Sequence, residues 1–347
     1  MDRVLELGGF AAGYCGRLFV QAGSDVVRVE TGARPPAWVS DAAMDLYLHA
    51  GKRRIATDDP ELIADLAARA DVVVVEGDTA DAVEALGFDA WDAPVKAAIT
   101  PFGRTGPKRN WQASTNVLLA MGGYTYIIGD PERAPLTLPG HYPEFQSGAF
   151  AYAAANACRL AGERNVIDLG MLEVVMALSQ FTTVMWHCGG LIRERHGSDF
   201  YYVVPTNLFR CADGWAYVNI VPGFWDPFAA FLDRPDLVID ERFETNALRR
   251  DNRHALHAII AAAIGPMTRA EVRRRAEECR IPIGVVQTIE DVLADPHLAV
   301  RGFWQTVRNG KAGSVRAPRR AWRMDGRTPP SRDLLPMETD LGERHDG

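Results

Sequence analysis

Short apolar runs alternate with helical stretches over the first hundred residues. The predicted strands cover residues 4–7, 25–30, 72–75 and 95–99. The third is a continuous run of valine, which is typical of a strand buried on both faces. Helical stretches at 12–21 and 80–86 lie between the strands. Alternation of this kind predicts a parallel sheet with helices on both faces.

Two longer helices are expected next, at residues 144–160 and 171–187. The first is rich in alanine. The second contains Glu173, Ser179 and two threonines, so it is too short and too polar to span a bilayer. A glycine-rich, charged stretch at 189–198 has the composition of a linker.

Beyond residue 198 the alternation of strands and helices gives way to a predicted hairpin and short helices. Residues 208–211 and 215–221 flank an Asp-Gly pair, which predicts a β-hairpin. The sequence TRAE at 268–271 is a capping box that begins a helix through Cys279. Thr288 begins another short helix, and the last forty residues, rich in arginine and proline, lack a clear period.

The whole pattern predicts an α/β fold in two parts, as a length of 347 residues suggests. We expect a large α/β domain over 1–195 and a small α+β domain over 200–305. We also expect residues 306–347 to form a C-terminal segment that returns to the large domain.

Charge and cysteine content narrow the function classes. The net charge of −7 provides no general basic field for nucleic acid or an anionic membrane. The five cysteines are widely spaced without a C-x-x-C pair, so neither a disulfide framework nor a zinc site is expected. No other metal-binding pattern is found, and no metal is predicted. Free thiols and an N-terminus without an apolar signal region indicate a cytoplasmic protein.

Several short motifs, in order along the chain, resemble the class III CoA-transferase family, which includes formyl-CoA transferase, carnitine CoA-transferase and α-methylacyl-CoA racemase. Residues 22–30 (AGSDVVRVE) are similar to the family's "GADVIKVE". Residues 51–55 (GKRRI) are similar to "NKRSI", and 100–107 (TPFGRTGP) to "SGFGQTGP". The resemblance covers some 300 residues. It implies a Rossmann-like large domain, a small domain and an interlocked homodimer.

The resemblance also implies a nucleophile. In the family's transferases, an aspartate four residues before a glycine at a helix start attacks the acyl-CoA carbonyl. Here the glycine is Gly148 and the position is Glu144. A glutamate can perform the same chemistry, in which a carboxylate forms a mixed anhydride and then an enzyme thioester. Its carboxylate lies one methylene further out, and a displacement of about 1 Å can cost ~100-fold in rate. The alternative is an acid at a helix N-terminus after Pro143, favoured by the helix dipole.

Residues around this position are candidates for contact with the substrate. His141 can share acid and base roles with Glu144, or it can be a loop histidine without a role. The histidine of the family's racemases corresponds to Ser114 and Thr115, so a standard two-base racemase is disfavoured. Asn116 is a possible hydrogen-bond donor. Gly122 and Gly123, similar to the family's "xxGG", complete the expected substrate contacts.

The expected ligand is coenzyme A, as an acyl-CoA, together with a small carboxylic acid. Its phosphates need cations, and glycines permit close backbone approach. The candidate CoA contacts are Arg28, Arg34, Lys52, Arg53, Arg54, Gly103 and Gly106. A run of three basic residues before a strand is otherwise a solvated edge.

Three functions follow from these residues. The first is CoA transfer between carboxylic acids through a covalent intermediate on Glu144. The second is proton transfer at the α-carbon of a 2-methylacyl-CoA, as in a racemase or isomerase. The third is a non-catalytic family member that binds a ligand without turnover.

Overall fold

The computed structural model describes residues 2–32, 42–200, 202–309, 313–323, 325–326 and 332–335. The chain divides into two compact units. The larger comprises Met1–Tyr126, Thr137–Arg193 and Pro296–Gly347; the smaller comprises Ile127–Leu136 and Glu194–Asp295. Compared with the predicted ranges, 127–136 belong with the smaller unit and 296–305 with the larger unit.

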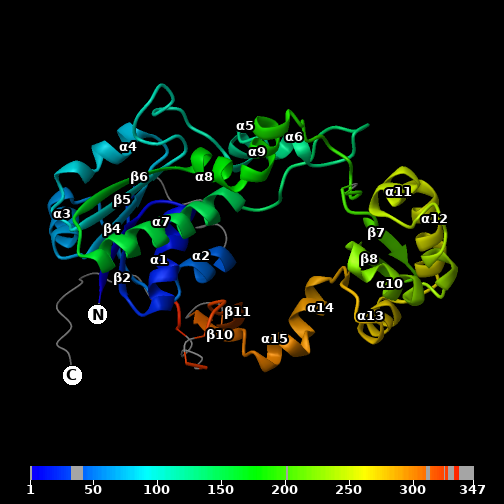
Figure 1. The fold of residues 1–347 in the computed structure, drawn as a ribbon. Coiled ribbons are helices and arrows are strands. Elements are labelled where there is room, and N and C mark those ends of the chain that lie inside the picture. Colours follow the sequence, from blue (N-terminus) through cyan, green and yellow to red (C-terminus); the bar gives the residue numbers. More distant parts are fainter. Residues whose placement is uncertain are drawn as a thin grey trace. The chain divides into compact units, whose positions relative to one another are not determined.

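The larger unit contains a six-stranded sheet in the order β3-β2-β1-β4-β5-β6 (Figure 1). All neighbouring strands are parallel, which confirms the predicted parallel sheet. The strands are β1 (Arg3–Leu7), β2 (Asp25–Glu30), β3 (Arg53–Ala56), β4 (Val72–Glu76), β5 (Val95–Thr100) and β6 (Asn165–Gly170).

Helices cover both faces of this sheet. Because side chains alternate along a strand, Val72 and Val74 of β4 pack on the α1 and α7 side, whereas Val73 and Val75 pack on the α3 and α4 side. The helices that precede the second unit are α1 (Phe10–Ala22), α2 (Ala42–His49), α3 (Pro60–Ala68), α4 (Ala80–Ala85), η2 (Phe88–Ala90), α5 (Thr115–Met121), α6 (Tyr124–Ile127), α7 (Tyr142–Ala161), α8 (Met171–Leu178) and α9 (Gln180–Gly189).

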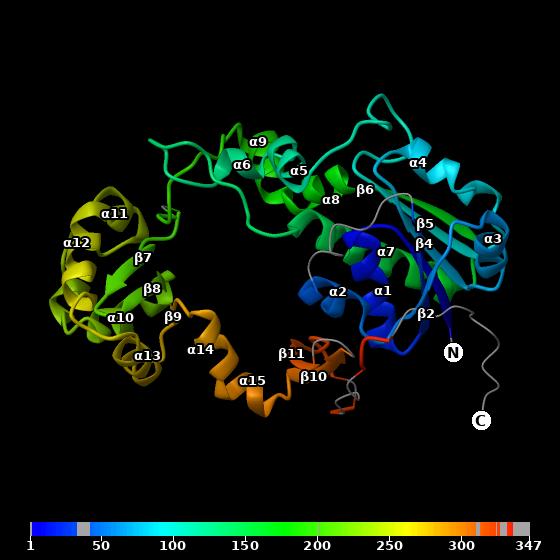
Figure 2. The same cartoon turned by 180° about the vertical axis from the view of Figure 1, so that it is seen from behind.

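Helices α1 and α7 lie side by side on the sheet (Figures 1 and 2). Gly148 makes this contact possible, because a Cβ atom at this position would lie 2.4 Å from the carbonyl oxygen of Ala11. The glycine that marks the family motif is therefore needed for close packing of the two helices. This packing holds the first turns of α1 and α7 next to each other.

The single helix predicted over 171–187 is wrong. The chain forms α8 and α9 instead, and they are separated at Ser179, where ψ is 14°. The Ser179 hydroxyl donates a hydrogen bond to the carbonyl of Met176 at 2.9 Å. Serine hydroxyls compete in this way for helical carbonyls and favour a local break. No helix of the described residues is long and apolar enough to cross a membrane.

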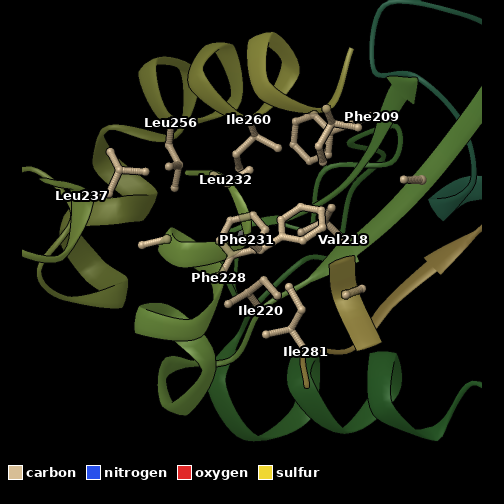
Figure 3. Close-up of a cluster of buried hydrophobic side chains, with 14 of the residues drawn as sticks. Phe209, Val218, Ile220, Phe228, Phe231, Leu232, Leu237, Leu256, Ile260 and Ile281 are labelled. Carbon is tan, nitrogen blue, oxygen red and sulfur yellow. The ribbon is translucent and has the colours of Figure 1, made fainter. Parts of the chain in front are cut away.

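The smaller unit is built on an antiparallel sheet in the order β7-β8-β9. Pairing of β7 with β8 confirms the predicted hairpin, and the capping box of α13 at Thr268 and Glu271 is also confirmed. Figure 3 shows its core, where Phe228 and Phe231 stack. The elements are β7 (Thr206–Cys211), β8 (Gly214–Asn219), η3 (Pro222–Phe224), α10 (Trp225–Phe231), η4 (Pro235–Val238), α11 (Asn246–Asp251), α12 (Arg253–Ile264), α13 (Arg269–Glu278), β9 (Ile283–Val285) and α14 (Ile289–Ala294).

The C-terminal part adds α15 (Pro296–Val300) and a hairpin of β10 (Trp304–Asn309) and β11 (Gly313–Pro318). The sequence pattern did not predict this hairpin. Its buried residues Val307 and Ala317 pack against Leu46 and Ala50 at α2. Hydrogen bonds join the same segment to α1, where Arg17 Nη2 donates to the carbonyl of Pro318 at 2.8 Å.

Candidate active site

Glu144 lies in the first turn of α7, with Pro143 directly before it. Proline suits this position because its fixed φ fits the helix and its missing N–H is not needed there. The helix dipole favours an acid in the first turn. Glu144 is buried, with 9% of its surface exposed. Local sequence therefore places a carboxylate at a helix N-terminus with little access to water.

The two oxygens of Glu144 have different surroundings. The Thr115 hydroxyl, at the start of α5, donates a hydrogen bond to Oε1 at 2.5 Å. His141 Nδ1 lies 3.9 Å from the same oxygen. Oε2 is buried and has no hydrogen-bond partner among the described residues. Thr115 thus orients the carboxylate, and one oxygen is available for a further contact. We refer to Glu144, Thr115 and His141 as the Glu144 cluster.

The imidazole of His141 is held by aromatic rings. It stacks on Phe10, at the start of α1, with ring centroids 3.9 Å apart and an interplanar angle of 20°. Phe145 contacts it edge-on at 6.5 Å. Its Nδ1 atom is buried and has no hydrogen-bond partner within the described chain. A histidine fixed by stacking beside a carboxylate can move or hold a proton there.

A second carboxylate, Glu76, belongs to the same region and was missed in the sequence. It ends β4 and accepts a hydrogen bond from the backbone N–H of Ala12 at 2.9 Å. Burial, together with the nearby charge of Glu144, raises the pKa of Glu76 to about 7. A Cβ atom at Gly9 would lie 2.4 Å from Oε1 of Glu76, so glycine is needed at this turn. Its position after a buried parallel strand was the available signal, because ligands bind at the carboxyl ends of such strands.

Two of the expected CoA contacts are buried in an ion-pair network instead. Arg28 Nη1 and Lys52 Nζ each lie 2.5 Å from an oxygen of Glu6, and all three side chains are at most 1% exposed. Lys52 also donates to the carbonyl of Gly13 at 2.7 Å and lies 3.1 Å from His49 Nδ1. We refer to Glu6, Arg28, His49 and Lys52 as the Glu6 cluster.

Burial explains why this network does not fit the expected role. A phosphate would have to displace Glu6 beneath α1, where a Cβ atom at Gly16 would already lie 1.7 Å from Oε2 of Glu6. Burial lowers the pKa of Lys52 to about 8, against the opposing effect of Glu6. Arg28 and Lys52 are therefore partners of Glu6 in this structure, a position that disfavours the predicted phosphate contacts of both.

The other basic residues expected to contact CoA lie outside the Glu6 cluster. Arg54 Nη2 lies 3.0 Å from both Glu30 Oε1 and Asp45 Oδ1, which makes a phosphate contact unfavourable there too. Arg53 is half-buried on β3. Arg34 lies outside the described residues.

The loop after β5 contains the two glycines expected near CoA. Gly103 and Gly106 both have φ of +82°, a backbone conformation that glycine adopts without strain. The backbone N–H of Arg104 donates to Asp168 Oδ1 at 2.8 Å, which ties the loop to β6. The glycines therefore shape a turn at the carboxyl ends of β5 and β6, the side of the sheet where ligands bind.

Of the expected substrate contacts, Thr115 is the one that reaches Glu144. Ser114 is exposed, and Asn116 Oδ1 accepts a hydrogen bond from the Thr137 hydroxyl at 3.1 Å. Gly122 is buried, and a Cβ atom there would lie 2.3 Å from Val175, so its role is packing. Gly123 is exposed with φ of +83°. The described residues contain no group of three or more potential metal ligands.

Comparison with known proteins decides the family. A family model described as CoA-transferase family III matches residues 2–339. The chain belongs to CoA-transferase family III. It is accordingly an enzyme of the CoA-transferase type, which disfavours a non-catalytic binding protein.

Relatives with assigned activities cover most of the chain. A succinyl-CoA:mesaconate CoA-transferase of Haloarcula hispanica is 30% identical over 334 residues, covering 85% of this chain and 82% of the relative. A succinyl-CoA–D-citramalate CoA-transferase of Chloroflexus aurantiacus is 28% identical over 344 residues, covering 90% and 84%. A succinyl-CoA:glutarate CoA-transferase of Mus musculus is 28% identical over 345 residues, covering 92% and 77%.

Solved structures agree on the fold. A CaiB/BaiF family protein from Brucella suis matches with a TM-score of 0.83 at 23% identity, covering 96% of this chain and 93% of the other. A hypothetical protein from Mycobacterium tuberculosis matches with a TM-score of 0.81 at 24% identity, covering 96% and 95%. The mixed α/β fold with a large parallel sheet is thus shared with CaiB/BaiF proteins.

Proposed function

We propose that this enzyme transfers CoA from an acyl-CoA thioester to a free carboxylic acid through Glu144. A carboxylate oxygen of Glu144 attacks the thioester carbonyl, the C–S bond breaks, and CoA leaves as a thiolate. The thiolate then attacks the glutamyl carbonyl of the mixed anhydride. This second attack releases the first acid and leaves CoA on Glu144 as a thioester.

The second half reverses these steps. The acceptor carboxylate attacks the glutamyl thioester and releases CoA thiolate, which attacks the acceptor side of the new anhydride. Glu144 is regenerated as a carboxylate, and the acceptor leaves as its CoA thioester. Bond exchange alone accounts for the cycle, so no oxidant, reductant or net proton is required.

The observation that supports this proposal is the state of Glu144. Its carboxylate is buried at the N-terminus of α7, held by Thr115 through Oε1, while Oε2 has no partner among the described residues. A nucleophile needs this combination of fixed orientation and one unengaged atom. The N–H groups of a helix N-terminus also favour the oxyanion that forms when Glu144 is attacked.

The substrate class follows from the relatives. Those reported above are named for succinyl-CoA as donor and for mesaconate, citramalate or glutarate as acceptor. We therefore propose that this enzyme uses succinyl-CoA or a similar thioester of a dicarboxylic acid, and a second dicarboxylate as acceptor. We further propose a homodimer, with CoA approaching the Gly103–Gly106 turn and Arg53.

Proton transfer at the α-carbon of the acyl group is the second candidate. The observation in its favour is His141, whose Nδ1 lies 3.9 Å from Glu144 Oε1 and has no other partner among the described residues. Such a pair can act as base and acid on one carbon. Deuterium incorporation at the α-carbon of a 2-methylacyl-CoA in D2O, without an acceptor acid, would support it and contradict CoA transfer as the main reaction.

The direct test is a transfer assay. Succinyl-CoA is mixed with each of a panel of dicarboxylates, and the new thioesters are separated by chromatography. Glu144→Gln is expected to lower kcat/KM at least ~1,000-fold, as loss of a covalent nucleophile does. Glu163→Gln is the matched control, because Glu163 is exposed just beyond α7. Equal activity of both variants would refute the role of Glu144.

A further inference from the structure

The loop after β5 presents a lysine and a tryptophan side by side. The backbone N–H of Trp111 donates to the carbonyl of Lys108 at 2.8 Å, which closes a turn. Lys108 Nζ lies 4.8 Å from the centre of the Trp111 ring. Trp111 is 54% exposed, so much of its ring is open to a ligand. We refer to these two residues as the Lys108–Trp111 pair.

Neighbouring residues hold this turn in place. Asn110 Nδ2 donates to Asp81 Oδ2 of α4 at 2.7 Å, and the backbone N–H of Asp81 donates back to Asn110 Oδ1 at 3.2 Å. Phe102 contacts the Trp111 ring edge-on, with ring centroids 6.1 Å apart. All of these residues belong to the larger unit. The pair is therefore positioned in advance, which lowers the entropy cost of binding a ligand.

Three basic residues lie in this loop, and their charges are compensated differently. Arg104 Nη2 lies 2.6 Å from Asp89 Oδ2, and Arg109 pairs with Glu84. Lys108 makes no ion pair with any described residue. A cation over an exposed ring is held weakly, and the flexible stem of lysine lets its ammonium turn towards an anion. Lys108 is therefore available to a phosphate, whereas the two arginines are engaged by carboxylates.

The position of the pair along the chain relates it to the nucleophile. Trp111 precedes Thr115 by four residues, and four extended residues span at most about 14 Å. Thr115 donates the hydrogen bond that holds Glu144. In CoA, the pantetheine arm separates the thioester sulfur from the adenosine 3′-phosphate end. A CoA molecule with its sulfur at Glu144 can thus extend its other end to Trp111.

We propose that the Lys108–Trp111 pair binds the adenosine 3′-phosphate end of CoA. The indole of Trp111 stacks on the adenine, because every base offers a π face to an aromatic ring. The ammonium of Lys108 pairs with the 3′-phosphate, which lysine binds as a point charge. The proposal rests on the proposed function for the identity of the ligand. It assigns to this loop a phosphate contact that Arg28 and Lys52, paired with Glu6, do not supply.

The first experiment measures binding of two nucleotides to the full chain by isothermal titration calorimetry. Adenosine 3′,5′-bisphosphate is expected to bind about tenfold more tightly than AMP, because the 3′-phosphate adds one charged contact. Lys108→Met should abolish this preference, and Lys108→Arg should retain most of it. Trp111→Leu should weaken binding of both nucleotides about tenfold, because the stacking contact is lost.

A second exposed tryptophan provides the matched control. Trp215, in the smaller unit, is 44% exposed and has the guanidinium of Arg210 5.9 Å from its ring centre. Trp215→Leu and Arg210→Met are expected to bind both nucleotides as the parent does. A parent that does not distinguish the bisphosphate from AMP would overturn the proposal. Equal weakening by the Trp111 and Trp215 variants would overturn it too.

The second experiment relates the pair to turnover. Lys108→Met is expected to raise KM for succinyl-CoA about tenfold at unchanged kcat, and to leave KM for succinyl-dephospho-CoA, which lacks the 3′-phosphate, as in the parent. An equal rise of KM for both donors would contradict the assigned phosphate contact. The nucleotides of the first experiment contain no thioester, so their binding is measured independently of acyl transfer. Nucleotide binding through the pair in a protein that transfers no CoA would support this site and refute the proposed function.

Discussion

The Glu6 cluster and the Glu144 cluster lie in the same unit and both contain residues that the sequence suggested for ligand binding. In the Glu6 cluster, Arg28 and Lys52 compensate one carboxylate and are closed off from solvent. In the Glu144 cluster, a carboxylate oxygen and a histidine nitrogen have no partner among the described residues. Removal of one partner from a buried ion pair destabilises the fold, whereas unpaired polar atoms at a helix N-terminus remain available for chemistry.

The largest effect is expected from loss of the Lys52 charge in the Glu6 cluster. Lys52→Met leaves a buried carboxylate with one cation fewer, and we expect it to lower the free energy of unfolding by about 3 kcal/mol. Urea denaturation followed by circular dichroism measures this loss. Lys108→Met is the control, because Lys108 lies over the exposed ring of Trp111 and not in an ion pair among the described residues. Equal loss in both variants would show that the Glu6 cluster does not stabilise the fold.

The next largest effect is expected at Glu144 itself. Glu144→Asp restores the aspartate of the family pattern but withdraws the carboxylate by one methylene from the geometry set by Thr115. We expect kcat to fall by roughly 100-fold, the cost of about 1 Å of misplacement, with no change in urea stability. Steady-state kinetics beside Glu163→Asp measure it. A variant as active as the parent would mean that Thr115 does not fix the position of the nucleophile.

The contribution of Glu76 to the stability of the fold depends on pH. Its pKa in the folded protein is raised from 4.5 to about 7, so the folded state binds this proton more tightly than the unfolded state. Stability from this group is present below about pH 4.5 and is lost as pH rises through about pH 7. Glu76→Gln retains an acceptor for the Ala12 N–H and removes this titration.

We therefore expect Glu76→Gln to be more stable than the parent by about 3 kcal/mol near pH 8 and similar to it near pH 4.5. Urea denaturation of both proteins across this range measures the difference. A difference that is constant with pH would contradict the raised pKa of Glu76.

The smallest effect is expected at Thr115. Thr115→Val removes the hydroxyl that holds Glu144 Oε1 and keeps the shape of the side chain. We expect kcat to fall by about tenfold while KM changes little, since a single hydrogen bond is lost. Thr115→Ser should restore most of the activity. If serine fails to do so, the methyl group of Thr115 and not its hydroxyl is important.

Sequence reasoning predicted the parallel sheet and the position of Glu144 because both depend on local signals. The valine run of β4 and the motif around Gly148 can be recognised without knowledge of the fold. The burial of Lys52 could not be predicted in this way. It depends on Glu6, 46 positions away, and on Gly16, which leaves space for that carboxylate under α1.

The surroundings of Glu76 and the hairpin of β10 and β11 could not be predicted from local signals either. Glu76 ends a strand, but its pairing with the first turn of α1 joins residues 64 positions apart. The strand character of β10 and β11 depends on packing against α2, through Val307 and Ala317. Tertiary contacts of this kind override weak local propensities.

The most direct test of the central claim is mass spectrometry of the tryptic peptide 134–159 after mixing the enzyme with succinyl-CoA. Glu144 is the sole carboxylate side chain in that peptide. Hydroxylamine converts a glutamyl thioester into a stable hydroxamate on the protein, whereas an acyl group on Cys158 would be removed. The account predicts a hydroxamate on Glu144 that depends on succinyl-CoA and is absent in Glu144→Gln. An unmodified peptide from enzyme that is turning over would contradict it.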